Sequence, residues 1–294
     1  ALAMVLVWMP GGSQLWAVLH GTATDRIIFA EDDTGLSVIK SNGDGFSTGG
    51  TVFVNGVGQS VIPFGGVHSA LGALPAFIHP DPKDAAIIGL GSGDTAFAVA
   101  GRPTMERLTS IEIIRPQLAT LRELGFRGLD GGVRSLLNDP RVEHLVGDGR
   151  TFLMRSGRRF DIIEADALRP TSAYAGNLFS DAYFRLVREH LNPNGLAAAW
   201  EPSTSRVRAT FLRVFPYVIA FPRVLLGSNE PIVIDREAIT SRVADPRVRE
   251  YYRRAGIDID QLMQVYLAAE PVRYGPAFDR STLTDFNTDL FPKD

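Results

Sequence analysis

The chain has 294 residues, 45% of them hydrophobic, and its 30 basic and 33 acidic residues leave a net charge of −3. This size suits one large domain with an appendage, or two domains that share an interface. Because basic and acidic residues are interleaved, nucleic acid and anionic membrane surfaces are disfavoured as main partners. The absence of cysteine excludes disulfides, thiolate metal sites and a cysteine nucleophile. The five histidines lack the spacing of a zinc helix, so no metal is expected.

The N-terminal residues 1–9, ALAMVLVWM, are apolar and uncharged. The run is far shorter than the ~20 residues of a membrane span. It also lacks the basic leader of a signal peptide. Two interpretations stay open, a strand or helix packed on the core and the end of a longer membrane segment. We therefore treat residues 1–25 as an apolar N-terminal segment.

Residues 26–63 contain short apolar segments separated by glycine-rich turns, namely RIIFAED, GLSVIKS and TVFVNGVGQSVI. Short strands bounded by turn residues predict a small antiparallel β-sheet domain. In residues 64–79 the apolar positions keep helical spacing, and HPDP ends the predicted helix.

Residues 64–294 are predicted to form an α/β domain. Five apolar strands alternate with helical stretches, and they read DAAIIGLG, LTSIEII, VEHLVGDG, RFDIIEAD and GLAAAWEP. Strands buried on both faces and separated by helices indicate a parallel, doubly wound sheet. The binding crevice of such a sheet lies beyond the carboxyl ends of its strands.

The ends of the first three of these strands carry residues that suit a nucleoside. Gly89, Gly91 and Gly93 form a GxGxG turn, where a ligand can approach the backbone and the start of the next helix. Glu112 ends the second strand, where an acid can accept both ribose hydroxyls; a surface glutamate is the alternative. Asp148 ends the third strand, where it either caps the next helix or accepts from an adenine amine.

The fourth strand, in RRFDIIEADALRP, delivers Asp166 to the same edge. Glu164 and Asp166 share strand parity, but only Asp166 lies at the crevice end. Arg169 follows three residues later. A glycine turn and three acids on four consecutive strands indicate an S-adenosyl-binding sheet more than a dinucleotide-binding one.

Longer segments carry a family resemblance. VFVNGVGQS, HSALGALPAFIHPDPKDAAIIGLGSGDTA, SIEI, VEHLVGDGRTFL, FDIIEAD and NLFSDAYFRLVREHLNPNGLAAAW occur in order and at similar spacing. Over residues 27–235 the chain resembles the spermidine synthase family of aminopropyltransferases. It is most similar to the spermidine-synthase-like domains that follow transporter-like membrane segments in some bacterial proteins. The resemblance implies a class I S-adenosylmethionine-methyltransferase-like fold with a small N-terminal antiparallel β domain. It also implies a homodimer in the cytoplasm. Where a membrane segment precedes the domain, the expected location is the cytoplasmic face of the membrane.

The resemblance also implies residue roles. Gln59 contacts the sulfur-containing nucleoside, Asp148 and Gly149 bind adenine, and Glu112 holds the ribose. The glycine turn cradles the ligand. Asp166 matches the acid that orients or deprotonates the attacking amine. Such chemistry requires an aligned neutral amine and removal of its proton, and a nearby carboxylate does both.

The chain departs from the family pattern at two places. Arg169 stands where the family has a second aspartate that helps to hold a cationic diamine. A tyrosine and an acid of the family are replaced around Val67, His68 and Ser69. Because arginine repels a diamine and attracts a carboxylate, the diamine acceptor is in question.

Three hypotheses follow. The first is aminopropyl transfer from decarboxylated S-adenosylmethionine to a small amine, with Asp166 as base and Arg169 turned away. The second uses intact S-adenosylmethionine for methyl or aminocarboxypropyl transfer, with Arg169 pairing with the methionine carboxylate or with an anionic acceptor such as an amino acid. The third is a non-catalytic nucleoside-binding module of a membrane protein.

Three further residues are substrate-binding candidates. Glu201 ends the fifth strand, where it either binds an amine or is an exposed strand-end acid. His68 either faces the ligand or is a partly buried helix histidine. Tyr174 lies in TSAYAGN, which is either a loop over the substrate or an ordinary connection.

Overall fold

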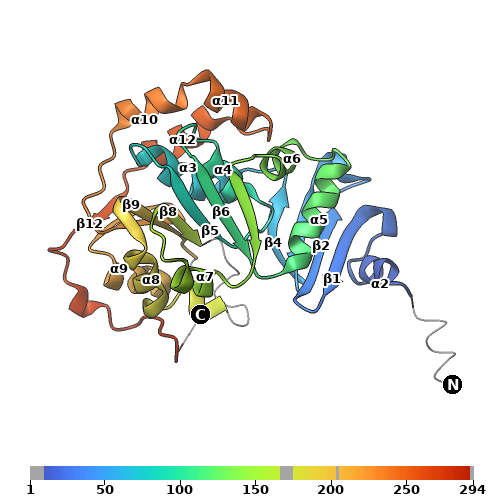
Figure 1. Ribbon diagram of the computed structural model, residues 1–294, viewed down its shortest axis with the longest axis horizontal. Helices are drawn as coiled ribbons and strands as arrows, with labels where there is room; N and C mark the ends of the chain where they lie inside the picture. Colours follow the sequence, from blue (N-terminus) through green and yellow to red (C-terminus); the bar gives the residue numbers. More distant parts are fainter. Residues whose placement is uncertain (1–9, 166–174, 203–204, 292–294) are drawn as a thin grey trace.

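The computed structural model describes residues 10–165, 175–202 and 205–291. Two sheets organise these residues, a four-stranded antiparallel sheet near the N-terminus and an eight-stranded sheet with helices on both faces (Figure 1). No helix within the described ranges is both long and apolar enough to cross a membrane.

The small sheet has the strand order β1-β2-β3-β4, with β1 at Ile27–Asp32, β2 at Gly35–Ser41, β3 at Gly50–Val54 and β4 at Val57–Ile62. The predicted antiparallel sheet is thus confirmed. The segment TVFVNGVGQSVI forms a hairpin, because Asn55 and Gly56 adopt φ values of 48° and 80°. Positive φ at both turn positions is typical of the two-residue hairpin turn that Asn-Gly favours. Helix α2 (Gly12–Leu19) packs against β1.

The large sheet has the order β12-β10-β11-β9-β8-β5-β6-β7. Its parallel strands are β5 (Asp84–Ile88), β6 (Arg107–Glu112), β7 (Val142–Val146), β8 (Phe160–Ala165) and β9 (Leu191–Trp200). These are the five predicted strands. The sheet continues with three antiparallel strands, β10 (Tyr217–Phe221), β11 (Val224–Ser228) and β12 (Val272–Tyr274). These three strands are additional to the five that the sequence predicts.

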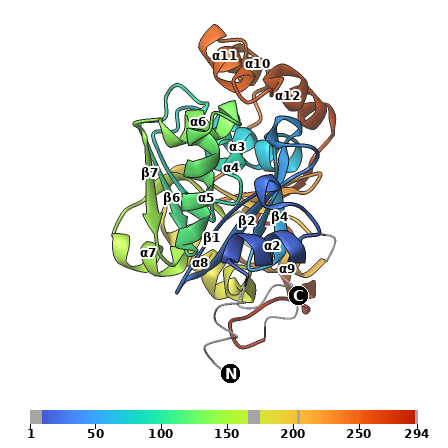
Figure 2. The same ribbon diagram turned by 90° about the vertical axis from the view of Figure 1, so that its right-hand side faces the viewer.

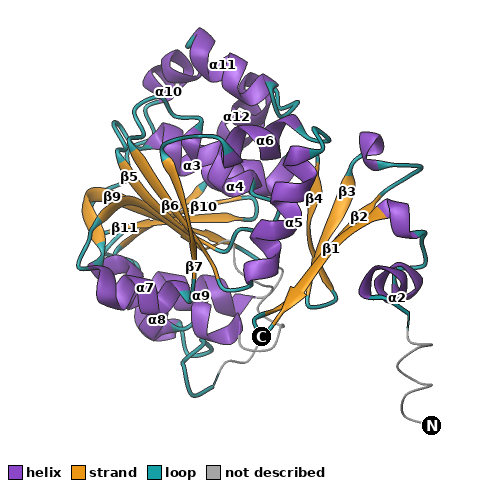
Figure 3. Ribbon diagram, turned by 45° about the vertical axis from the view of Figure 1, so that its right-hand side comes forward, coloured by secondary structure: helices purple, strands orange, loops and turns teal. Residues whose placement is uncertain are grey.

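Helices cover both faces of the large sheet (Figure 3). One face carries α3 (Gly66–Ile78), α4 (Asp94–Ala100), α5 (Arg115–Phe126) and α6 (Gly131–Leu137). Beyond them lie α10 (Arg236–Val243), α11 (Pro246–Arg253) and α12 (Ile259–Ala268). The other face carries α7 (Gly149–Ser156), α8 (Asp181–Glu189) and α9 (Ser205–Val214). Alternate strand residues such as Ile87 and Ile88 therefore enter separate apolar cores.

Helix α5 joins the small sheet to the large one, since it packs against β1 and β2 (Figure 2). The Ser37 hydroxyl in β2 donates to Gln117 Oε1 at 2.9 Å and lies 2.8 Å from the Thr120 hydroxyl. Gln117 Nε2 donates to the Gly91 carbonyl at 2.5 Å. All three polar side chains are buried. The small sheet is thereby linked through one helix to the glycine turn after β5.

We expect Gln117→Leu to lower the free energy of unfolding by roughly 1–3 kcal/mol, because it leaves the buried Ser37 hydroxyl and the Gly91 carbonyl without this partner. Urea denaturation followed by circular dichroism measures the change. Glu123→Ala on the same helix is the control, since its ion pair with Arg127 is exposed and contributes about 0.5 kcal/mol or less. Equal midpoints for Gln117→Leu and the wild type would contradict the linking role.

Candidate functional site

The glycine turn leads from β5 into α4, as the sequence predicted. Gly89, Gly91 and Gly93 adopt φ values of 95°, 52° and 92°, which side-chain-bearing residues rarely adopt. A Cβ atom at Gly93 would lie 2.6 Å from Leu136 Cδ2. Both backbone conformation and packing therefore favour glycine in this turn.

Glu112 lies beside this turn at the carboxyl end of β6. Its carboxylate accepts hydrogen bonds from the backbone N–H groups of Leu90 and Ile114, each at 2.8 Å. Only 9% of the residue is exposed, so the surface-glutamate interpretation is wrong. Burial raises the pKa of Glu112, although the backbone N–H groups oppose that shift. The carboxylate is thus fixed against the backbone of the glycine turn.

Asp148 and Gly149 follow β7 at the same edge of the sheet. Asp148 Oδ1 accepts from Thr151 N at 2.7 Å, which confirms the helix-cap interpretation. The side chain is exposed, so capping and contact with a ligand are compatible. A Cβ atom at Gly149 would lie 2.4 Å from Ile88 Cγ2, and this close packing requires glycine.

The small sheet contributes β4 to this region. A Cβ atom at Gly91 would lie 3.4 Å from Ser60 Oγ, so β4 lies against the turn. Gln59 Nε2, Ser60 Oγ and Ser92 Oγ are buried and have no hydrogen-bond partner among the described residues. Buried polar atoms are generally satisfied, so Ser60 and Ser92, which lie at the turn, fit a polar ligand there, while the contact of Gln59 with a ligand stays a prediction. Ser60 and Ser92 were not singled out from the sequence, although they adjoin Gln59 and the glycines.

The remaining candidates separate into two groups. Asp166, Arg169 and Tyr174 lie outside the described residues, and β8 ends at Ala165. His68 lies on α3 and is partly buried, and its carbonyl accepts from the Thr95 hydroxyl at 3.2 Å. Its assignment to substrate stays a prediction.

Glu201 follows β9 and is 7% exposed, so the exposed-acid interpretation is wrong. Both of its carboxylate oxygens accept from the Arg208 guanidinium, the Nη2–Oε2 pair at 2.8 Å. Glu201 is thus a buried residue that forms an ion pair with Arg208. The assignment of Glu201 to an amine substrate stays a prediction.

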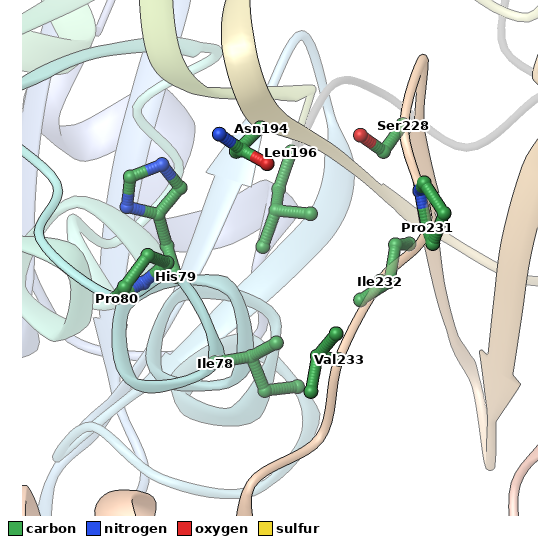
Figure 4. A pocket seen from close by; sticks show the side chains of 9 residues that line it. All are labelled: Ile78, His79, Pro80, Asn194, Leu196, Ser228, Pro231, Ile232 and Val233. Carbon is green, nitrogen blue, oxygen red and sulfur yellow. The ribbon is translucent and has the colours of Figure 1, made fainter.

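A cavity of about 130 Å³ lies elsewhere (Figure 4). His79 after α3, Asn194 near the start of β9 and Ser228 at the end of the antiparallel β11 line it. It therefore opens at the edge of the sheet opposite the glycine turn, and none of the predicted site residues lines it. Within the described residues, no group of three or more histidine and carboxylate side chains is placed to hold a metal ion.

Comparison with protein families gives a match to the spermine/spermidine synthase domain over residues 65–211, half of the chain. The chain belongs to the spermine/spermidine synthase family. This confirms the resemblance found in the sequence. The matched range includes the glycine turn, Glu112, Asp148 and the whole of β8.

Two curated family members illustrate the relationship. The polyamine aminopropyltransferase of Nitrosomonas europaea is 26% identical over 244 residues, which cover 76% of this chain and 74% of that protein. The polyamine aminopropyltransferase of Thermococcus onnurineus is 35% identical over 118 residues, 40% of each chain. The chain thus spans about three quarters of one relative and less than half of the other.

Solved family structures share the fold. A spermidine synthase in complex with the transition state analogue AdoDATO has a TM-score of 0.59 at 20% identity, over 77% of this chain and 88% of that one. A probable spermidine synthase from Corynebacterium glutamicum has a TM-score of 0.55 at 17% identity, over 89% and 95%. The predicted class I methyltransferase-like fold with a small β domain is therefore confirmed.

If Glu112 holds the ribose, nucleoside affinity should depend on pH. Its raised pKa means that it takes up a proton at higher pH than an ordinary glutamate, and a protonated carboxyl accepts hydrogen bonds less well. Affinity for methylthioadenosine should therefore be highest above this pKa and fall as the pH drops through it. Calorimetric titration over a pH series measures this.

Glu112→Gln should weaken methylthioadenosine binding about 10- to 100-fold, since hydrogen bonds to a charged group contribute roughly 1.5–3 kcal/mol. It should also remove the pH dependence. Glu123→Gln, an exposed glutamate on α5, is the matched control and should bind like the wild type. An unchanged affinity in Glu112→Gln would rule out the ribose contact.

Proposed function

We propose that the chain transfers an aminopropyl group from decarboxylated S-adenosylmethionine to a small amine acceptor. The supporting observation is the family match over residues 65–211, which spans the glycine turn and the strand that leads to Asp166. Curated relatives over this region are polyamine aminopropyltransferases. The proposal makes the chain a transferase that uses the nucleoside as co-substrate.

The described residues fit a nucleoside at the turn. Gln59 supplies a buried amide donor without a partner among the described residues, and Glu112 supplies a fixed acceptor for ribose hydroxyls. Asp148 is exposed beside Gly149, where it would accept from the adenine amine. These assignments place one amide donor and two carboxylate acceptors around the sugar and base, and carboxylates suit the hydroxyl and amine donors of a nucleoside.

The proposed reaction is a direct displacement. The acceptor nitrogen attacks the propyl carbon bonded to sulfur, the new C–N bond forms, and the C–S bond breaks. The sulfonium sulfur takes the bonding electron pair and leaves as the thioether of methylthioadenosine. Asp166 takes the proton lost by the nitrogen. The protein contributes alignment of the amine and removal of this proton, because a sulfonium carbon is already a good electrophile.

The charge of Arg169 is relevant to the identity of the acceptor. Its guanidinium would repel the second cation of a diamine and attract a carboxylate. An acceptor that combines an amine with a carboxylate, such as an amino acid, therefore suits this position better than a diamine. The same guanidinium would also attract the carboxylate of intact S-adenosylmethionine. The donor and the acceptor therefore have to be tested together.

We expect Asp166→Asn to reduce turnover by about 100-fold or more, the usual contribution of a positioned base, while nucleoside affinity changes little. Chromatography that identifies the nucleoside product measures turnover and the reaction type at once. Release of methylthioadenosine supports aminopropyl transfer, and S-adenosylhomocysteine would indicate methylation. Normal turnover in Asp166→Asn would remove it as the base.

Arg169→Ala separates the two donors. If Arg169 binds the methionine carboxylate, the substitution should weaken S-adenosylmethionine about tenfold or more and leave the decarboxylated donor almost unchanged. Calorimetric titration of both donors into both proteins gives the comparison, with Arg127→Ala on α5 as an exposed arginine control. Equal losses of affinity for the two donors would show that Arg169 does not bind the methionine carboxylate.

The family resemblance also implies a homodimer, which we retain as a proposal. Light scattering of the purified protein coupled to size-exclusion chromatography tests it. A mass of about 32 kDa, that of one chain, would overturn it.

A further inference from the structure

The C-terminal strap, residues 279–291, lies across α7, α8 and α9 (Figure 1). Asn287 fixes its middle, because its carbonyl accepts from Asp181 N at 3.0 Å and its N–H donates to the Thr210 hydroxyl at 2.9 Å. Asn287 is only 1% exposed. The strap is thus packed against the helices that begin near the candidate site.

Arg150 and Asp289 connect this strap to the first turn of α7. The Arg150 guanidinium donates to both Asp289 oxygens, at 2.9 and 2.6 Å, in a bidentate pair. It also donates to the Asn177 carbonyl at 3.2 Å. Arg150 directly follows Asp148 and Gly149, the predicted adenine contact, and its side chain joins the start of α7 to the segment before α8 and to the strap.

The network continues through Ser180. Its hydroxyl donates to Asp289 Oδ1 at 2.5 Å and accepts from Tyr183 N at 3.1 Å as the cap of α8. The hydrogen bond from Arg150, followed by that from Ser180, lowers the pKa of Asp289. Asp289 therefore remains ionised at neutral pH and is bonded to side chains at the starts of two helices.

We propose that Arg150 and Asp289 are positioning residues for the nucleoside site. Their ion pair fastens the strap to α7 and so fixes the position of Asp148 and Gly149. The inference rests on the proposed function, which assigns adenine to these two residues. Asp148 is exposed, and its carboxylate has one hydrogen bond within the described residues, to Thr151 N. Its position consequently depends on how the start of α7 is held.

A reciprocal effect follows from this arrangement. If the docked strap favours nucleoside binding, the nucleoside must favour the docked strap by the same factor. Methylthioadenosine should therefore slow amide hydrogen exchange in residues 279–291 of the wild type. It should slow exchange there less in Asp289→Asn, at equal site occupancy.

The affinity test uses two substitutions of the same residue. Asp289→Asn should raise the Kd for methylthioadenosine about 3- to 10-fold and raise the KM for the donor without a matching fall in kcat. Asp289→Glu keeps the charge and should restore most of the affinity. Rescue by the conservative variant distinguishes positioning from a general loss of folding, and circular dichroism of both variants checks the fold.

Asp260→Asn provides a matched control. It breaks the Arg249–Asp260 pair, which is also bidentate at 2.7 Å and exposed, but joins α11 to α12 away from the glycine turn. This variant should bind methylthioadenosine like the wild type. Equal affinities of Asp289→Asn and the wild type would overturn the inference alone. A wild type that binds the nucleoside but releases no methylthioadenosine during turnover would overturn the proposed function alone, and a wild type that binds no nucleoside would overturn both.

Discussion

The buried Gln117 side chain is the contact on which the arrangement of the candidate site depends. Its amide oxygen accepts from Ser37 in the small sheet, and its amide nitrogen donates to the carbonyl of Gly91. A fully buried carboxamide strongly disfavours any arrangement in which these hydrogen bonds are lost. The small sheet is consequently held so that β4, with Gln59 and Ser60, lies against the glycine turn. Two sheets that are separate in sequence thus meet at the candidate site.

The edge of the large sheet at the carboxyl ends of its parallel strands could be predicted, because the sequence patterns that mark it are local. Strands buried on both faces show as continuous apolar runs, and the glycines and acids that end them mark one edge. Glu112 could be placed at that edge in this way. Its burial could not, because it depends on a hydrogen bond from Leu90, 22 residues away, and on packing that no local pattern records. Asp148 was ambiguous for a different reason, since capping and ligand contact require the same residue at the same position.

Longer-range contacts left no sequence signal. Arg150 and Asp289 are 139 residues apart, and neither stands in a motif that indicates the other. The antiparallel β10 and β11 resemble the parallel strands in composition, and strand direction follows from how the chain returns to the sheet. The ion pair of Glu201 similarly depends on the first turns of α9 folding back over the end of β9. Each of these features is decided by tertiary packing.

The nucleoside half and the acceptor half of the proposed site therefore have different physical origins. The nucleoside half would be built on strand ends, a helix cap and left-handed glycines, and the backbone of the glycine turn holds the Glu112 carboxylate in place. We expect the acceptor half to depend on the residues that follow β8, where the family resemblance places Arg169 at the position of an aspartate. A change of charge at this position is expected to alter which acceptor is attracted. The same scaffold can thus keep its donor chemistry while its acceptor changes, and the family match accordingly supports the donor more strongly than the acceptor.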